Sequence, residues 1–115
     1  MTLPHNHEQE IEKHFEHMPK EESFHVVADV FKLLSDSNRV RIFWMLCHCE
    51  ECVINISALM EMSSPAVSHH LRLLKDNGLI TSRRDGKEVY YKAAETEQAE
   101  MLHQAIEKMA RITCI

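Results

Sequence analysis

Three cysteines and a histidine fall within six consecutive positions, in the stretch CHCEEC at residues 47–52. Thiolates are soft ligands, which favour Cd(II), Pb(II), As(III), Cu(I) or Zn(II) over Mg(II) or Ca(II). We therefore predict a metal or metalloid site formed by Cys47, Cys49 and Cys52. A free cysteine can also fill space as a small hydrophobe, and this interpretation applies best to Cys47, which ends an apolar helical stripe.

Helical geometry limits how these cysteines can act together. If the helix before them continued through residue 52, Cys49 and Cys52 would be neighbours at i and i+3, whereas Cys47 and Cys49 would point apart. A third ligand then needs a break in the helix near Glu50 or a residue from elsewhere. The N-terminal arm, residues 1–22, offers four histidines for this purpose, although a disordered, solvated arm is the simpler interpretation of them: His5, His7, His14 and His17.

Length and composition bound the kind of protein that carries this stretch. The chain has 115 residues, 44% of them apolar, with only two glycines and three prolines, which favours one small, mostly helical domain. It has no apolar stretch long enough to cross a membrane, and its first residues do not resemble a signal peptide. We expect a cytoplasmic protein, no contact with membranes, and cysteines that stay reduced.

The hydrophobic pattern predicts a mobile arm over residues 1–22 and one domain over residues 23–115. Two helices, 54–62 and 65–77, are separated only by a short turn, which is a helix-turn-helix. Two β-prone runs then flank Asp85-Gly86, a dipeptide favoured in tight hairpins, and a hairpin behind a helix-turn-helix is a wing. The fold class predicted is mainly α with a β-hairpin wing. Further helices are predicted over 8–18, from 23 to the SDS at 35–37, from there to 47, and over 95–113.

Charge is spread unevenly along the chain, whose net charge is −5. Residues 63–92 carry six basic and three acidic groups and form the one positive segment, so we expect double-stranded DNA to bind there. Short polar side chains on the second helix of the motif suit close approach to base edges, and cationic ones suit phosphates. The predicted DNA-binding residues are Ser68, His69, Arg72 and Lys75 on this helix, and Arg83, Arg84 and Lys87 in the wing.

Three runs of the chain resemble one family: LLSDSNRVRIFWML, SSPAVSHHLRLLKDNGLI and RRDGKEVYYKA. They are similar to the ArsR/SmtB family of winged-helix repressors that sense metals, over about residues 25–110. The resemblance implies a homodimer joined through its first and last helices and bound to an inverted-repeat operator of a resistance or efflux operon. It also implies that effector binding releases the DNA, and it places Ser64, Ser68 and His69 at the bases.

The metal motifs of that family are only partly kept. Cys52-Val53 matches the start of its C-V-C-D motif, but Ile54 and Asn55 stand where the second cysteine and the aspartate would be. A cysteine at the position of Cys47 resembles the cadmium- and lead-sensing branch. That branch takes further thiolates from its N-terminal arm, and the arm of this chain has none.

The second metal site of the family lies on the last helix and is lost here in its usual form. The matching residues are Glu95, Glu97, Lys108 and Arg111, and cationic side chains cannot ligate a metal at neutral pH. A displaced site is conceivable on one helical stripe, although a solvated helix face is the simpler interpretation. That stripe consists of Glu100, His103 and Glu107.

Three functions fit these features to different degrees. The preferred one is a repressor released from DNA when a thiophilic ion binds the cysteines. The alternative is a redox or persulfide switch in which Cys47 or Cys49 pairs with Cys114. A thiol-rich metal buffer or interaction module would leave the positive segment unexplained. No enzyme is predicted, because no phosphate-binding glycine loop or nucleophile-base pair is evident.

Overall fold

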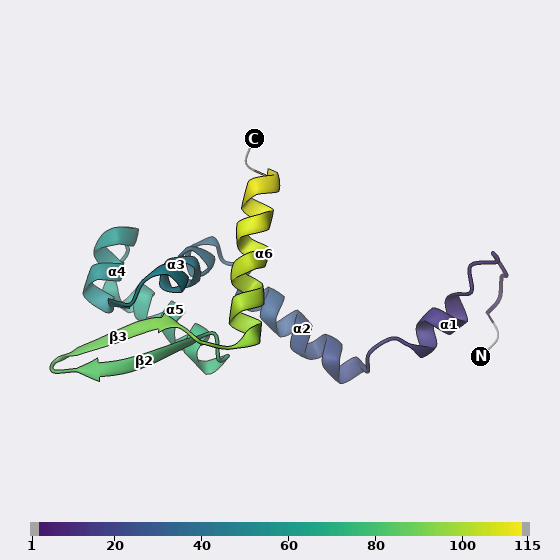
Figure 1. Ribbon diagram of the computed structural model, residues 1–115, viewed down its shortest axis with the longest axis horizontal. Helices are drawn as coiled ribbons and strands as arrows, with labels where there is room; N and C mark the ends of the chain where they lie inside the picture. The colour runs from purple at the N-terminus through teal and green to yellow at the C-terminus, as the bar shows by residue number, and fades with distance from the viewer. Residues whose placement is uncertain (1–2, 114–115) are drawn as a thin grey trace.

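The computed structural model describes residues 3–113, which fold into a body of helices with a projecting hairpin (Figure 1). Cys114, one of the cysteines considered above, lies outside this range. The elements are α1 (Ile11–Glu16), α2 (Glu21–Leu33), α3 (Ser37–His48), β1 (Glu51–Cys52), α4 (Val53–Met60), α5 (Ser64–Asp76), β2 (Ile80–Asp85), β3 (Glu88–Ala93) and α6 (Glu97–Thr113).

Short polar side chains begin two of the helices that position the DNA-binding residues. The Asp36 carboxylate accepts a hydrogen bond from the backbone N–H of Arg39 at 3.0 Å at the start of α3, as the sequence predicts. At the start of α5, Ser64 followed by Pro65 predicts a helix capped by the Ser64 hydroxyl, and this prediction is wrong. Ser63 is the cap, accepting from Ala66 N–H at 3.3 Å, because Ser64 is already the first helical residue.

The hairpin has the predicted turn, and a third strand that the sequence did not reveal. Gly86 adopts φ +64° between β2 and β3, a conformation that glycine reaches without strain. The two-residue β1 pairs antiparallel with β3, placing Cys52 opposite Tyr90 in a sheet of order β1-β3-β2. Helix α3 therefore ends at His48, and Cys49 is extended, with φ −154° and ψ 165°.

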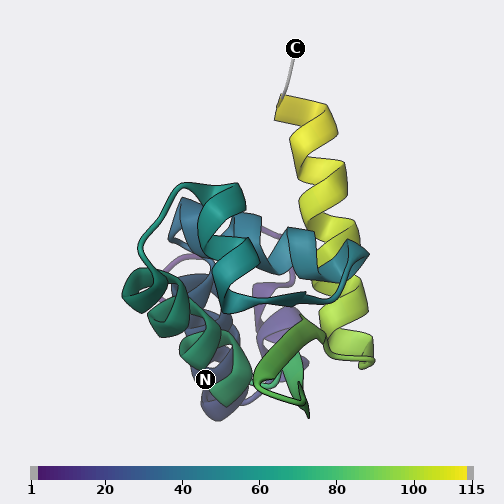
Figure 2. The same ribbon diagram turned by 90° about the vertical axis from the view of Figure 1, so that its left-hand side faces the viewer.

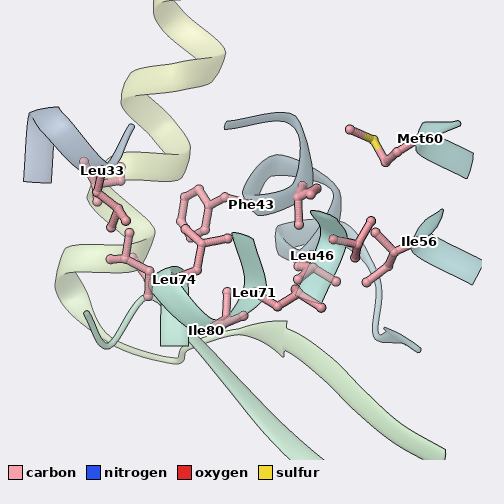
Figure 3. Packing of buried hydrophobic residues seen from close by; sticks show 13 residues of the cluster. Leu33, Phe43, Leu46, Ile56, Met60, Leu71, Leu74 and Ile80 are labelled. Carbon is pink, nitrogen blue, oxygen red and sulfur yellow. The ribbon is translucent and has the colours of Figure 1, made fainter. Parts of the chain in front are cut away.

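One apolar core joins the end of α2, where Leu33 lies, with α3, α4, α5, the base of the hairpin and the first turns of α6 (Figure 3). Phe43 of α3 and Leu74 of α5 are fully buried, and Leu71 and Ile80 are nearly so. The helical spacing of Ile56, Leu59 and Met60 predicts that Leu59 faces this core, but 63% of it is exposed. The predicted winged helix-turn-helix is confirmed, and we call α4, α5, β2 and β3 the winged motif.

Helices α2 and α6, which we call the outer helices, keep large apolar side chains outside the core. The second half of α6 stands clear of the body in both ribbon views (Figures 1 and 2). The exposed fractions on these helices include 71% for Phe31, 63% for Met109 and 68% for Ile112. Helix α1 has no buried residue. No helix within residues 3–113 has the length and apolar character needed to cross a membrane.

Candidate DNA-binding surface and metal-binding residues

Helix α5 separates its apolar and polar side chains into two faces. Val67, Leu71 and Leu74 are buried at 1% exposure or less. On the outer side, Ser64, His69 and Arg72 are exposed and Ser68 is half-buried. Lys75 is also exposed, but its Nζ donates a hydrogen bond to Ser82 Oγ of the wing at 2.6 Å. The structure thus leaves four of the five predicted residues of this helix facing outward, whereas Lys75 ties the helix to the hairpin.

His70 is a buried residue of α5 that sequence analysis passed over. It is 8% exposed, and the Arg39 Nε–H donates to its Nδ1 at 3.2 Å. Burial lowers the pKa of His70, and the nearby Asp36 carboxylate opposes this only in part. The ring is therefore a neutral acceptor that joins the start of α3 to α5. Its place next to Leu71 on the apolar stripe was the signal available in the sequence.

The three cations predicted in the wing differ in their surroundings. Arg83 donates from Nε to both Glu50 carboxylate oxygens at 3.0 Å and from Nη2 at 2.6 Å, and its guanidinium lies 4.9 Å from the Tyr90 ring centroid. The hydrogen bonds to Glu50 raise the pKa of Arg83. Arg84 and Lys87 are exposed, and no ion pair involving either is found within residues 3–113. They are therefore the free cations near the hairpin tip.

Cys47 and Cys49 line one cavity of about 520 Å³ beside α6. Its other wall carries Glu100 and His103, and Glu50 lies at its edge. Burial raises the pKa of the Cys47 thiol to about 11, with the negative charges of Glu100 and Glu107 adding to the effect. Cys47 is therefore protonated at neutral pH and a slow nucleophile. The exposed Cys49 thiol donates to the carbonyl oxygen of Met45 at 3.3 Å.

Cys52 lies apart from this cavity. Because Cys52 follows Glu50 and Glu51, the sequence predicts that it is exposed, but only 7% of it is. The reason is that it lies in β1, which pairs with β3; it also occupies the position before the first residue of α4, without a side-chain capping hydrogen bond. Because α3 ends at His48, Cys49 and Cys52 do not share a helical turn. The three sulfur atoms do not gather into one ligand set in the described part of the chain.

The other candidate ligands are only partly brought together. The arm histidines do not line the cysteine cavity, and α1 lies at the far end of the molecule from the hairpin (Figure 1). On α6 the stripe divides: Glu100 accepts a hydrogen bond from Gln104 at 3.0 Å, whereas His103 and Glu107 approach each other at 3.3 Å. Their third neighbour is His48 of α3, a residue of the CHCEEC stretch not considered as a ligand.

This fold and surface define a winged helix-turn-helix protein, and comparison with known proteins identifies its family. The family model described as "Bacterial regulatory protein, arsR family" matches residues 36–82. The chain is 41% identical over 80 residues to a cadmium resistance transcriptional regulatory protein CadC homolog of Staphylococcus aureus, covering 69% of this chain and 66% of that one. It is 36% identical to an arsenical resistance operon repressor from the same organism, covering 60% of this chain and 66% of that one.

Solved structures agree with this result. The homodimeric winged helix-turn-helix DNA-binding domain of a possible ArsR-family regulator from Mycobacterium bovis is similar over 85% of this chain and 92% of its own, with 27% identity and a TM-score of 0.72. Reduced HlyU from Vibrio cholerae is similar over 83% of this chain and 96% of its own, with 29% identity and a TM-score of 0.68. The chain belongs to the ArsR/SmtB family. It spans 66% of the S. aureus CadC homolog and 56% of CadC from Listeria innocua.

Proposed function

We propose that this protein is a DNA-binding transcriptional repressor that responds to a thiophilic metal or metalloid ion. The observation that carries the proposal is the outward polar face of α5, with Ser64, Ser68, His69 and Arg72, together with the free cations Arg84 and Lys87 in the wing. These side chains lie in the one positive segment of an acidic chain. Relatives are named as repressors or regulators of cadmium and arsenical resistance, which supports the same class of role.

The outer helices support a homodimer. Phe31 of α2 and Ile112 of α6 are large apolar residues that are more than two-thirds exposed, an arrangement that favours contact with a second copy. The similar M. bovis domain is homodimeric. A two-fold dimer presents two α5 helices, which can enter successive major grooves if they lie about 34 Å apart, one turn of DNA. The matching operator is an inverted repeat.

The donor atoms around residues 47–52 suit a soft cation as the effector. Cys47 and Cys49 provide sulfur at one cavity, and Glu100 and His103 add oxygen and nitrogen on its other wall. This set fits Cd(II), Pb(II), Zn(II), As(III) or Cu(I). Metal binding to Cys47 releases a proton, since its thiol is protonated at neutral pH. Cys52 joins the site only if β1 shifts, because it is buried in that strand.

The place of these cysteines explains how ion binding would release DNA. Cys49 follows the last residue of α3, and only the short β1 separates it from α4, the first helix of the motif. An ion that changes the path of residues 49–52 changes the distance between the two α5 helices of a dimer. A coupling of about 1–3 kcal/mol between the two sites would lower DNA affinity some 5- to 150-fold.

A metal titration with a matched control tests this role of the cysteines. The reduced protein, bound to a fluorescent inverted-repeat duplex, is titrated with Cd(II) while anisotropy and thiolate-to-metal absorption are followed. The Cys47→Ser, Cys49→Ser double variant should bind the duplex as the natural chain does. Addition of Cd(II) should then give no thiolate-to-metal absorption and should not release the DNA. Cys114→Ser is the matched control and should respond like the natural chain.

Two outcomes decide against parts of the proposal. If the double variant still releases DNA with Cd(II), these two cysteines are not the effector ligands. If the reduced protein ignores Cd(II), Pb(II), Zn(II), As(III) and Cu(I) but releases DNA after polysulfide treatment, the switch is a thiol modification, which mass spectrometry would locate. Absence of salt-dependent binding to any inverted repeat from its own genome would overturn the repressor function itself.

A further inference from the structure

Three side chains from α3 and α6 bring one nitrogen or oxygen atom each close together, and one of them, His103, also lines the cysteine cavity. The Nε2 atoms of His48 and His103 lie 3.1 Å apart, and each is 3.3 Å from Oε1 of Glu107. His48 comes from the last turn of α3, whereas His103 and Glu107 are one turn apart on α6. The two helices thus contribute to one triangle of nitrogen, nitrogen and oxygen.

The dimensions of this triangle match one face of a metal tetrahedron. In tetrahedral zinc sites with bonds of about 2.0–2.1 Å, two donor atoms are separated by about 3.3 Å. The three observed edges, 3.1, 3.3 and 3.3 Å, are close to that separation. A cation 2.0–2.1 Å from all three atoms, the bond length typical of zinc, would stand slightly outside their plane and keep a fourth position open.

Hydrogen bonding alone satisfies this arrangement poorly. A neutral imidazole has one N–H. With two neutral rings, at most two of the three contacts can be hydrogen bonds, because the third would pair two N–H groups or two lone pairs. Two protonated rings would repel each other at 3.1 Å, even with one carboxylate beside them. A cation bound by two neutral rings and a carboxylate uses all three lone pairs at once.

Trp44 holds the carboxylate in place from one turn earlier on α3. Its indole N–H donates to Glu107 Oε1 at 2.9 Å, and its ring lies 4.2 Å from the His48 ring, centroid to centroid. This hydrogen bond is the main cause of a lowered pKa of Glu107, ahead of those from the two histidines. Such outer hydrogen bonds to a ligand are characteristic of metal sites.

We propose that His48, His103 and Glu107 form a second metal site, which binds a borderline divalent cation such as Zn(II) through two nitrogens and one oxygen. A water or an external ligand completes the tetrahedron. The site shares His103 with the lining of the cysteine cavity but uses no sulfur atom. It also differs from the family pattern on the last helix, whose matching residues are Glu95, Glu97, Lys108 and Arg111. A bound cation would also hold α6 against α3. It would thus connect α6, which belongs to the proposed dimer interface, to the helix that precedes the winged motif.

Trp44 is the only tryptophan of the chain and provides a local test on the free protein, without DNA. Co(II) is the probe, because it occupies zinc sites and quenches a nearby indole. One equivalent per chain should quench Trp44 fluorescence and give the visible absorption of tetrahedral Co(II), and Zn(II) should reverse both. His48→Gln and Glu107→Gln, from different helices, should each weaken Co(II) binding at least tenfold.

Two matched variants separate this site from other ligands. His25→Gln removes a histidine that also pairs with a glutamate one helical turn away, Glu21 at 3.6 Å, and should leave the quenching unchanged. The Cys47→Ser, Cys49→Ser double variant should lose thiolate absorption but keep the quenching. Unchanged quenching in both His48→Gln and Glu107→Gln, or no quenching in the folded natural chain, would overturn the site. Neither result depends on whether the protein is a repressor.

Discussion

In the winged motif most large apolar side chains are buried, with Ile54 and Leu59 of α4 as exceptions, whereas on the outer helices most are exposed. Leu74 and Ile56 have no exposed surface, but Phe31 and Ile112 expose 71% and 68% of theirs. Hydrophobic burial contributes roughly 25 cal/mol for each Å² removed from water, so the two regions differ in where they gain stability. The winged motif gains it within one chain, whereas the exposed apolar side chains of the outer helices can gain it only against a partner.

Leu74→Ala tests whether the winged motif is stabilised within one chain. Removing a fully buried leucine should lower the free energy of unfolding by about 2–5 kcal/mol. Urea denaturation measures the loss, which should be similar at low and high protein concentration. Met109→Ala, on the exposed part of α6, is the control and should lower the stability of a monomer very little. If Leu74→Ala lowers the free energy of unfolding by much less, the winged motif is not stabilised mainly by burial within one chain.

Phe31→Glu tests the outer helices. A charge at the centre of an apolar interface should weaken dimerisation by about 2 kcal/mol or more, as loss of an interface anchor does. Sedimentation equilibrium measures the shift to monomer, and the circular dichroism spectrum of the monomer should stay helical. Lys32→Glu places the same charge beside it on α2 as a control. An unchanged dimer would show that α2 does not form the interface.

Arg84→Ala and Arg83→Ala test whether the free arginine and the paired arginine of the wing contribute differently to DNA binding. Loss of the free Arg84 should weaken DNA binding by about 1 kcal/mol. The slope of log affinity against log salt concentration should fall by about one, the value expected for one phosphate contact. Loss of Arg83 should weaken it less, because its guanidinium is held by Glu50. Fluorescence anisotropy at several salt concentrations measures both. Equal losses would mean that Arg83 exchanges Glu50 for a phosphate when DNA binds.

The pH dependence of stability should give the smallest effect. The folded state lowers the pKa of His70, so the unfolded chain takes up a proton first as the pH falls. The contribution of neutral His70 to the free energy of unfolding is therefore complete above the pKa of the unfolded chain, about 6.5, and is lost as the pH falls below that value. The fall in stability between pH 7 and 5 should be shallower in His70→Gln, measured by urea denaturation. An equal slope would assign the titration to other groups.

The winged motif was predictable because its signals are local. Asp85-Gly86, Asn77-Gly78 and the apolar spacing of Val67, Leu71 and Leu74 each act within a few residues. The pattern therefore placed α5, the hairpin and the outward face of α5 correctly. It could not show that Arg83 is held by Glu50, 33 positions away, because that contact exists only once β1 pairs with β3.

The surroundings of the cysteines were harder to predict, because they depend on where one helix stops. No glycine or proline marks the end of α3, so the sequence left open whether the helix continued through Cys52. The end at His48 separates Cys49 from Cys52 and buries Cys52. It also directs His48 toward His103, 55 positions later, and no spacing rule within one helix reveals such a pair.

The two-residue strand β1 carries a mechanical consequence. It bonds the segment that follows Cys49 directly to β3, and β3 bonds in turn to β2. A displacement at residues 49–52 would therefore pass to β3 and β2 through backbone hydrogen bonds and move the hairpin. Its tip, at the far end of two six-residue strands, amplifies a small rotation at the base. Arg84 and Lys87 near that tip would then travel farther than any side chain on α5.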